Sequence, residues 1–419
     1  MSKLDDLINK LCPDGVEYKK IRDITSYTRG KGLSKEVKGT GNTPIILYGE
    51  LYTTYGNYIE SITSFAADEF IKTSVKIKKG SLLLPISSTT KEAQIGKASV
   101  LKVDECYLGS DAISFYPNDN INPDFLMYLI NGSVFENFKM RCVKGTTIRH
   151  LDPGKLQDIE IPVPPLEIQN EIVRILDNFT ELTAELTAEL TARKKQYEYY
   201  RDSLLTFKTE IPRVKLGDIA TEIYRGSGIK KDEVTLDGIP CVRYGEIYTK
   251  YNIWFDSCVS HTKLEYVSSP KYFEYGDILF AITGESVEDI AKSIAYVGKE
   301  KCLAGGDIVV MKHKQNPKYL SYALSTVDAI KQKGKGKVKS KVVHSSVPAI
   351  QDIEIPLPPL EIQERIVNVL DNFDAICSDL KIGLPAEIDA RKKQYEYYRD
   401  LLLRFEPIGT VLATHTRGN

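Results

Sequence analysis

The sequence predicts α/β (α+β) domains in tandem, each followed by long helices that pair as an antiparallel coiled coil, with a pseudo-two-fold internal repeat. Two matches reveal the repeat: residues 157–179 agree with residues 351–373 at 18 of 23 positions, and ARKKQYEYYRD at 192–202 returns unchanged at 390–400. The third observation is an apolar stripe after residue 166 at helical spacing, which is typical of packed helices. Related helical segments pack most simply about a two-fold axis, and an axis across the helices makes them antiparallel.

The regions before the two helical segments are also related, but more weakly. YGELYTTY at Tyr48 corresponds to YGEIYTKY at Tyr244, TRGKG at Thr28 to YRGSG at Tyr224, and GSLLLPISS to GDILFAITG. Diverged domains beside nearly invariant helical segments indicate that the helices share one structural role. The expected boundaries are 1–158 and 210–352 for the mixed domains, 159–209 and 353–405 for the helical segments, and 406–419 for a tail.

The individual elements follow from local patterns. Runs such as VKIKKGSLLLPI and DILFAITG predict strands bounded by glycine turns. NPDFLMYLINGSVFENF and NPKYLSYALSTVDAIKQ predict amphipathic helices after an Asn-Pro start. Each P-x-P-P-L-E-I-Q phrase predicts a long helix from about Pro165 or Pro359, because the prolines disfavour helix before them. Gly383 and Pro385 predict a break or kink in the second helical segment.

Composition narrows the class of protein. With 42% hydrophobic and 27% charged residues, the 419-residue chain resembles an ordinary globular protein of two or three domains. It has no apolar run long enough for a membrane span and no N-terminal leader pattern, so we expect a cytoplasmic protein without a membrane partner. Seven scattered cysteines without a C-x-x-C pair suit reduced thiols, and the five histidines offer no metal-ligand spacing.

Signals for catalysis are missing from the sequence. The VPPLE and LPPLE phrases lack the acidic or amide residue of the D/N-P-P-F/Y motif of adenine methyltransferases, and there is no phosphate-binding glycine loop. PDGVEYK at Pro13 imitates a nuclease motif, but its two carboxylates are too close in sequence to lie on separate strands. The histidines form no credible triad. We therefore expect a chain that is not itself an enzyme and has no cofactor or metal of its own.

In the repeated phrases the chain resembles the specificity subunit of type I restriction–modification systems. P-x-P-P-L-E-x-Q-x-x-I-V-x-x-L-D, RKKQYEYYRD and the TAEL tetrads of 179–191 carry the resemblance, especially to the group with tandem tetrads in the central region. It implies two target-recognition domains, each reading one half of a split, asymmetric site in double-stranded DNA. It also implies that the helices act as a spacer and bind two methylation subunits, joined later by restriction/translocase subunits. S-adenosylmethionine, ATP and Mg²⁺ belong to those partners.

Candidate DNA contacts are polar or cationic residues at matching places in the two mixed domains, since phosphates need cations and base edges need forked donors or acceptors. In the first domain they are Arg29, Lys31, Tyr48, Glu50, Tyr52, Thr89, Thr90, Lys91, Lys144 and Arg149. In the second they are Arg225, Ser227, Tyr244, Glu246, Tyr248, Thr283 and Glu285, with Lys333, Lys335, Lys337 and Lys339 of an alternating lysine run suited to phosphates. The recurrence of YGE in both domains also fits a scaffold role.

The helical segments supply a second set of candidates, for packing and subunit docking. They are Leu182, Leu186, Leu190, Tyr197, Tyr200, Tyr395 and Tyr398. The exact duplication of the tyrosine phrase favours helix packing over DNA contact. Two other functions stay open from the sequence: a coiled-coil assembly protein without sequence-specific DNA reading, and a DNA methyltransferase or nuclease with its own site.

Overall fold

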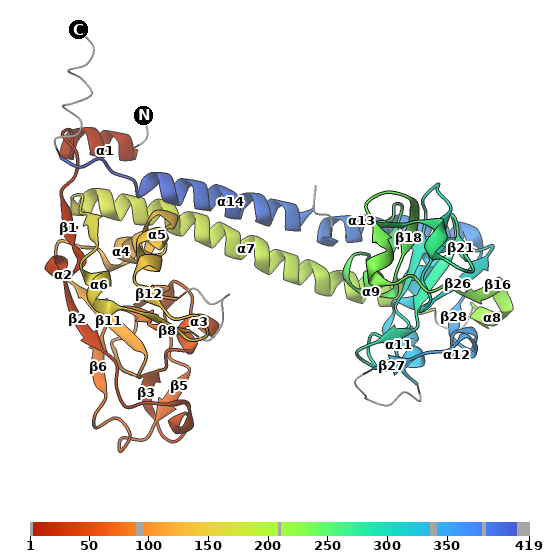
Figure 1. Ribbon diagram of the computed structural model, residues 1–419, viewed down its shortest axis with the longest axis horizontal. Helices are drawn as coiled ribbons and strands as arrows, with labels where there is room; N and C mark the ends of the chain where they lie inside the picture. Colours follow the sequence, from red (N-terminus) through yellow and green to blue (C-terminus); the bar gives the residue numbers. More distant parts are fainter. Residues whose placement is uncertain (1–2, 89–94, 208–210, 336–341, 379–382, 409–419) are drawn as a thin grey trace, which may run out of the picture. The chain divides into compact units, whose positions relative to one another are not determined.

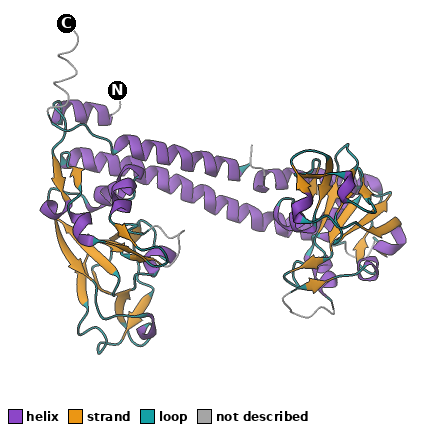
Figure 2. Ribbon diagram, viewed as in Figure 1, coloured by secondary structure: helices purple, strands orange, loops and turns teal. Residues whose placement is uncertain are grey.

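The computed structural model describes residues 3–88, 95–207, 211–335, 342–378 and 383–408, and it divides into two compact units (Figure 1). Unit 1 comprises Met1–Leu186 and Ile388–Asn419, and unit 2 comprises Thr187–Glu387. Each unit combines sheets with helices, as the sequence predicts, and each is described by itself below (Figure 2).

Unit 1 is built on a five-stranded and a four-stranded sheet. The five-stranded sheet has the order β2 (Thr25–Arg29), β11 (Ala112–Pro117), β7 (Leu82–Pro85), β9 (Ser99–Leu101), β4 (Tyr58–Ile59). The four-stranded sheet has the order β5 (Ser64–Ala66), β3 (Thr43–Ile46), β10 (Glu105–Leu108), β6 (Val75–Lys78). Smaller ladders pair β1 (Tyr18–Lys20) with β14 (Glu160–Pro162), and β12 (Val143–Lys144) with β13 (Arg149–Leu151) and β8 (Ser87–Ser88). The turn between β6 and β7 contains Gly80 at φ +84°, at the predicted glycine turn.

Unit 2 repeats this plan with two five-stranded sheets. The first has the order β16 (Ala220–Arg225), β26 (Ile308–His313), β22 (Ile278–Ala281), β24 (Ser293–Tyr296), β19 (Trp254–Phe255). The second has the order β17 (Val234–Thr235), β20 (Ser260–Thr262), β18 (Ile239–Val242), β25 (Cys302–Ala304), β21 (Tyr272–Phe273). Short ladders pair β15 (Arg213–Lys215) with β28 (Glu354–Pro356), and β23 (Thr283–Gly284) with β27 (Val343–His344).

Each helical stretch predicted after an Asn-Pro start is two helices. These are α4 (Pro123–Ile130) and α5 (Ser133–Arg141) in unit 1, and α10 (Pro317–Leu324) and α11 (Val327–Gly334) in unit 2. Asn122 and Asn316 cap the first helix of each pair through side-chain oxygens that accept backbone N–H groups. The second helix starts anew because Gly132 and Thr326 adopt extended backbone conformations.

The remaining helices outside the long segments are short. They are α1 (Lys3–Leu11), α2 (Ile21–Ile24), α3 (Glu50–Thr53), α6 (Pro153–Gln157), α8 (Leu216–Ile219), α9 (Tyr244–Thr249) and α12 (Val347–Gln351), with 3₁₀ turns η1 (Lys35–Val37), η2 (Lys231–Glu233) and η3 (Leu264–Tyr266). The helix α9 contains the second YGE phrase, whereas α3 begins at the glutamate of the first, and both helices help to form the candidate site.

The long helices begin where the prolines predict. The first helical segment is the single helix α7 (Leu166–Leu204), and the second is divided into α13 (Leu360–Ser378) and α14 (Leu384–Leu402). The division lies next to Gly383 and Pro385, as predicted, because proline is tolerated in the first turn of a helix but not in its interior.

Each helical segment starts in one core and ends in the other. Ile168 and Leu176 of α7 belong to the core of unit 1, whereas Tyr197, near the end of α7, is buried in unit 2. The second segment does the reverse: Leu370 of α13 lies in the core of unit 2, and Leu402 of α14 packs on the core of unit 1. Both units thus contain the start of one segment beside the end of the other, in antiparallel orientation.

A glutamine explains part of the near-identity of the helical segments. The side-chain nitrogen of buried Gln169 donates to the carbonyls of Pro164 and Asn120, and its oxygen accepts the backbone N–H of Asn122 at 2.8 Å. Gln363 repeats this in unit 2, with bonds to Pro358 and Asn316. The repeated glutamine therefore ties the start of each long helix to the loop that caps α4 or α10.

Candidate nucleic-acid interface

A polar pocket occurs at the same place in each unit, where three loops meet. One loop follows β2 or β16, the second leads into α3 or α9, and the third precedes β11 or β26. Several residues that line the pocket of unit 2 lie 196 positions after residues that line the pocket of unit 1 (32 and 228, 48 and 244, 111 and 307). The two pockets are therefore equivalent parts of the repeat.

Glycines allow the first and third loops to approach closely. A Cβ atom on Gly30 would lie 1.9 Å from the carbonyl oxygen of Gly109, and one on Gly226 would lie 2.2 Å from that of Gly305. No other residue type fits this crossing without displacing backbone. The RG phrase recurs in both domains because the crossing itself recurs.

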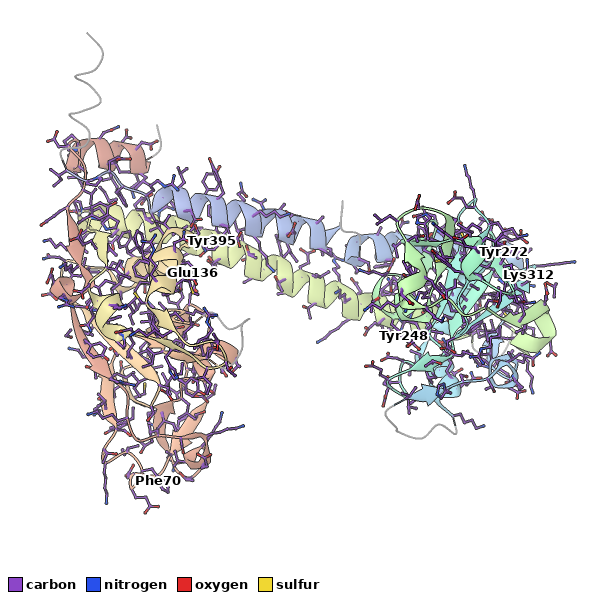
Figure 3. The ribbon with its side chains drawn as sticks, in the orientation of Figure 1. Phe70, Glu136, Tyr248, Tyr272, Lys312 and Tyr395 are labelled. Atoms are coloured by element: carbon purple, nitrogen blue, oxygen red, sulfur yellow. The ribbon has the colours of Figure 1, made fainter. Side chains whose placement is uncertain are left out.

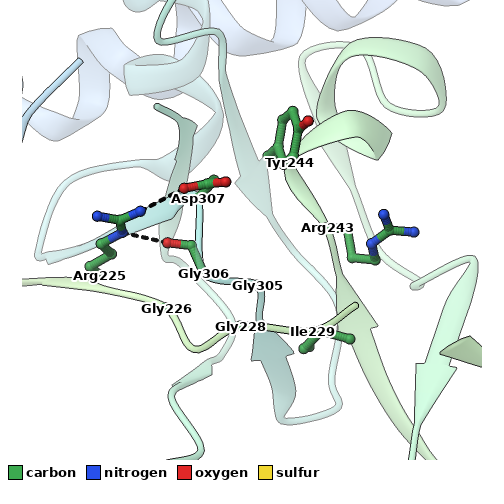
Figure 4. A pocket seen from close by; sticks show the side chains of 9 residues that line it. All are labelled: Arg225, Gly226, Gly228, Ile229, Arg243, Tyr244, Gly305, Gly306 and Asp307. Atoms are coloured by element: carbon green, nitrogen blue, oxygen red, sulfur yellow. Dashed lines mark hydrogen bonds and ion pairs between the residues drawn. The ribbon is translucent and has the colours of Figure 1, made fainter. Parts of the chain in front are cut away.

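The two pockets differ in size and in side chains. The pocket of unit 1 has a volume of about 630 Å³ and includes Lys35, Tyr48 and Asp111 in its lining. The pocket of unit 2 has a volume of about 430 Å³, and its polar lining includes Arg225, Arg243, Tyr244 and Asp307 (Figure 4). Equivalent frames thus present different chemistry to a ligand.

The glutamates of the YGE phrases make contacts that suit the scaffold role left open by the sequence. Glu50 is only 7% exposed, and its carboxylate accepts from Lys38 Nζ at 2.9 Å, from the backbone N–H of Leu47 and from Ser64. Glu246 likewise accepts from the backbone N–H of Arg243 at 2.8 Å and from Ser260. Both carboxylates fix the loop before a helix.

The tyrosines of these phrases divide between frame and pocket. Tyr52 donates its hydroxyl to the carbonyl of Ser87 at 3.0 Å, and Tyr248 donates to that of Ala281 at 3.3 Å. Burial raises the pKa of Tyr248 to about 12 and that of Tyr52 further still. Tyr52 thus ties α3 to β8 and Tyr248 ties α9 to β22, whereas Tyr48 and Tyr244 line the pockets.

Two arginines predicted to contact DNA lie at the ends of equivalent strands, and the second of them, Arg225, lines the pocket of unit 2. Arg29 is exposed at the end of β2, and Lys31 is exposed two residues later. Arg225 ends β16 and pairs with Asp307 at 2.6 Å. Ser227, the counterpart of Lys31, donates its hydroxyl to the carbonyl of Ser269.

A second polar surface lies on the short ladders. In unit 1, Arg149 is paired with Ser88 in the ladder β13–β8, and Lys144 is exposed on the neighbouring strand, 3.4 Å from Asp152. In unit 2, the hydroxyl of Thr283 lies 3.2 Å from Nδ1 of His344. Glu285 is exposed just after β23. Thr89, Thr90 and Lys91, also predicted to contact DNA, lie outside the described residues.

The lysine run was expected to be a cationic loop, but its first part is helical. The assignment of Lys333 as a phosphate contact is therefore wrong. Lys333 lies inside α11 and is only 7% exposed, with Nζ donating to the carbonyl of Leu324 at 2.8 Å and to Ser293 Oγ at 3.0 Å. Lys335 is exposed just after the helix. Lys337 and Lys339 lie outside the described residues.

Among the predicted packing residues of the helical segments, Tyr200 and Tyr398 make ring contacts between helices. The ring of Tyr200 stacks on Phe373 at 5.5 Å in unit 2, and that of Tyr398 stacks on Phe179 at 5.5 Å in unit 1. Tyr197 is buried in unit 2, and Tyr395 packs on the core of unit 1 (Figure 3). Among the tetrad leucines, Leu182 is exposed, whereas Leu186 and Leu190 are half-buried.

Sequence reasoning missed Arg243 and gave no role to Asp307. Both line the pocket of unit 2, and Arg243 forms no ion pair with any residue in the described part of the chain. Aligning the two mixed domains with each other could have revealed Arg243. Its counterpart in the first domain is Leu47, so this position changes from apolar to cationic between two otherwise equivalent loops.

The described residues lack two further kinds of feature. They contain no cluster of three or more His, Cys, Asp or Glu residues placed to hold a metal ion. They also contain no helix with the length and apolar character needed to cross a membrane.

Comparison with known proteins assigns the family. The model of the type I restriction modification DNA specificity domain matches twice, at residues 13–193 and 210–390. The chain belongs to this family, and it is a DNA specificity subunit of the type I restriction–modification class. The two matches follow the internal repeat.

Individual relatives agree. The specificity subunit of the type I restriction enzymes EcoR124I and EcoR124II of Escherichia coli is 36% identical over 60% of this chain and 64% of its own length. A Haemophilus influenzae type I restriction enzyme specificity subunit is 30% identical over 68% of this chain and 73% of its own length.

Solved structures share the fold. A chain from a study of assembly and conformational transition of a type I system covers 94% of this chain and 98% of its own length, with a TM-score of 0.64 at 16% identity. The specificity subunit from M. genitalium covers 93% of this chain and 96% of its own, with a TM-score of 0.51 at 13% identity.

Proposed function

We propose that the two pockets and the ladders beside them read the two halves of a bipartite, asymmetric site in double-stranded DNA. The observation that carries this proposal is the duplicated pocket: two equivalent frames hold different side chains within one chain of a DNA specificity family. A protein that reads two unlike half-sites needs such an arrangement, because each frame positions its loops and the variable side chains choose the bases.

The helical segments serve a different purpose in this proposal. Their near-identical sequences and paired tyrosine contacts suit a fixed spacer that also docks two methylation subunits, with restriction/translocase subunits joining the complex. S-adenosylmethionine, ATP and Mg²⁺ would be bound by those subunits, and the chain itself would catalyse no reaction. In this proposal, residues 1–158 and 210–352 form the two DNA-reading domains, and residues 159–209 and 353–405 form the spacer.

Footprinting tests the function directly. The assembly of the full chain with its methylation subunits would be incubated with a pool of random duplex DNA, and the protected fragments sequenced. We expect two short conserved blocks separated by a gap of constant length. Uniform protection without a conserved block would contradict sequence-specific reading and favour a coiled-coil assembly protein. Methylation or cleavage by the chain without partners would identify it as an enzyme.

A further inference from the structure

The guanidinium of Arg225 is held on one edge by a single turn of unit 2. Its Nε–H donates to the carbonyl of Gly306 at 2.5 Å, and its Nη2 donates to Oδ1 of Asp307 at 2.6 Å (Figure 4). The turn itself is fixed, because the carbonyl of Asp307 accepts the backbone N–H of Ile282 at 3.0 Å. Arg225 is therefore positioned before any ligand arrives.

The remaining edge of the guanidinium is left for a ligand. An arginine has five N–H donors in a planar fork, and the Nε–Nη2 edge is the one used by the turn. One N–H of Nη1 and the second N–H of Nη2 remain as a pair of nearly parallel donors. The side chain is 59% exposed, and no acceptor for Nη1 occurs among the described residues.

A pair of parallel donors matches the major-groove edge of guanine, whose O6 and N7 are neighbouring acceptors. Adenine offers one acceptor and one donor at the same place, so it would leave a donor unmatched. A phosphate fits less well, because the carboxylate of Asp307 offsets the charge of Arg225 and would repel a second anion. We propose that Arg225 reads a guanine in the half-site bound by unit 2, and that Asp307 is its positioning residue. This inference rests on the proposed function.

Unit 1 provides an internal comparison. Arg29 is the counterpart of Arg225, and Asp111 is the counterpart of Asp307. The carboxylate of Asp111 instead accepts from Ser87 Oγ at 3.0 Å, and Arg29 forms no ion pair with a described residue. The anchored arginine belongs to unit 2, so the inference applies to one half-site only.

Methylation mapping with single variants tests the assignment. DNA modified by the complex of the full chain with its methylation subunits would be sequenced for methylated adenines. We expect the unchanged chain to require guanine at one position of a half-site, and Arg225→Ala to reduce that preference roughly ten- to a hundredfold. All other positions should keep their preference. Asp307→Asn should relax the same position more weakly, and should add nothing to Arg225→Ala.

A matched control separates base reading from a general surface effect. Arg213 also donates through Nη2 to a carboxylate, that of Asp328 at 2.5 Å, and to the carbonyl of Glu354 at 2.8 Å, but it lies outside the pocket. Arg213→Ala should leave the motif unchanged. Arg225→Lys keeps the positive charge but loses the paired N–H donors of the guanidinium, so it should also weaken the preference for guanine at that position. Thermal melting of each variant would show that the fold is retained.

Two results would overturn the inference while leaving the proposed function intact. One is a bipartite motif that is unchanged by Arg225→Ala or has no guanine that responds to it. The other is a uniform loss of DNA affinity with a weaker salt dependence and the same base preference, which marks a phosphate contact. If the unchanged chain directs methylation to no bipartite motif, the proposed function fails together with the inference.

Discussion

At the scale of single residues, a buried lysine caps the C-terminus of a helix in each unit. Nζ of Lys333 donates to the carbonyl of Leu324, the last residue of α10. Lys139 is 1% exposed, lies 3.5 Å from the carbonyl of Ile130, the last residue of α4, and pairs with Glu136 at 2.6 Å. A lysine amine at the C-terminus of a helix satisfies carbonyls that lack partners within the helix.

The titration of Lys333 gives a prediction for stability. Burial, with a smaller contribution from Lys292, lowers its pKa to about 7, whereas an unfolded lysine titrates near 10.4. The unfolded chain therefore binds more protons between about pH 7 and 10, so the stability due to neutral Lys333 is present above that window and declines as pH falls through it. We expect the stability difference between the native chain and Lys333→Met to rise with pH there, by up to about 1.4 kcal/mol per pH unit.

Chemical unfolding at several pH values would measure this difference. Lys335→Met is the control, because Lys335 is exposed just after the same helix. A difference for Lys333→Met that stays constant from pH 7 to 10 would contradict a neutral buried amine.

The residues of the site were predictable to different degrees. Recurrence of YGE indicated a scaffold, and the carboxylates of Glu50 and Glu246 hold the loops before α3 and α9. Alternating lysine and glycine pointed to a loop, but the hydroxyl of Thr326 caps α11 and the helix continues to Gly334. The pattern could not reveal that Lys333 turns inward, because its partners are a carbonyl and a hydroxyl elsewhere in the fold.

At the scale of elements, stacked aromatic rings hold the long helices together at equivalent places. Tyr398→Ala removes the stack on Phe179 in unit 1. We expect the free energy of unfolding to fall by about 1–2 kcal/mol, from lost burial and lost ring contact. Tyr397→Ala, at a neighbouring ring that is 65% exposed, should cost less than about 0.5 kcal/mol. Equal losses in urea unfolding would contradict the packing role.

The tetrads of α7 lead to a prediction about spacing. One more T-A-E-L after Leu190 adds four residues to a continuous helix, which lengthens it by about 6 Å. We expect the gap between the half-sites to change while both half-site sequences stay the same. Methylated sites mapped across a genome would show this, and altered half-sites with an unchanged gap would refute it.

Helix starts were predictable because they depend on local chemistry. Prolines before Leu166 and Leu360 set the first turns, and Pro385 places the break before α14. Strand pairing is harder to predict from the sequence, because β8 and β13 are distant along the chain and only folding brings Ser88 beside Arg149. The division between α4 and α5 was not predicted, because the residues on both sides of Gly132 follow a helical pattern and a single glycine does not by itself mark a helix end.

At the scale of the whole molecule, two recognition domains differ in sequence, whereas the helical segments that follow them are nearly identical. Replacing residues 1–155 by the matching domain of another family member leaves α7, α13 and α14 intact. We expect one half-site to change and the other half-site and the gap to persist. Methylation mapping of the chimera would check this, with the parent chain as control. Simultaneous change of both half-sites would show that the domains do not read independently.

We propose above that one chain directs modification to a two-part DNA site. The most direct measurement is to map methylated adenines in a host that expresses this chain together with its methylation subunits. We expect one motif with two specific blocks and a gap of fixed length. Methylation at a single uninterrupted motif, or no sequence preference in the presence of active methylation subunits, would contradict it.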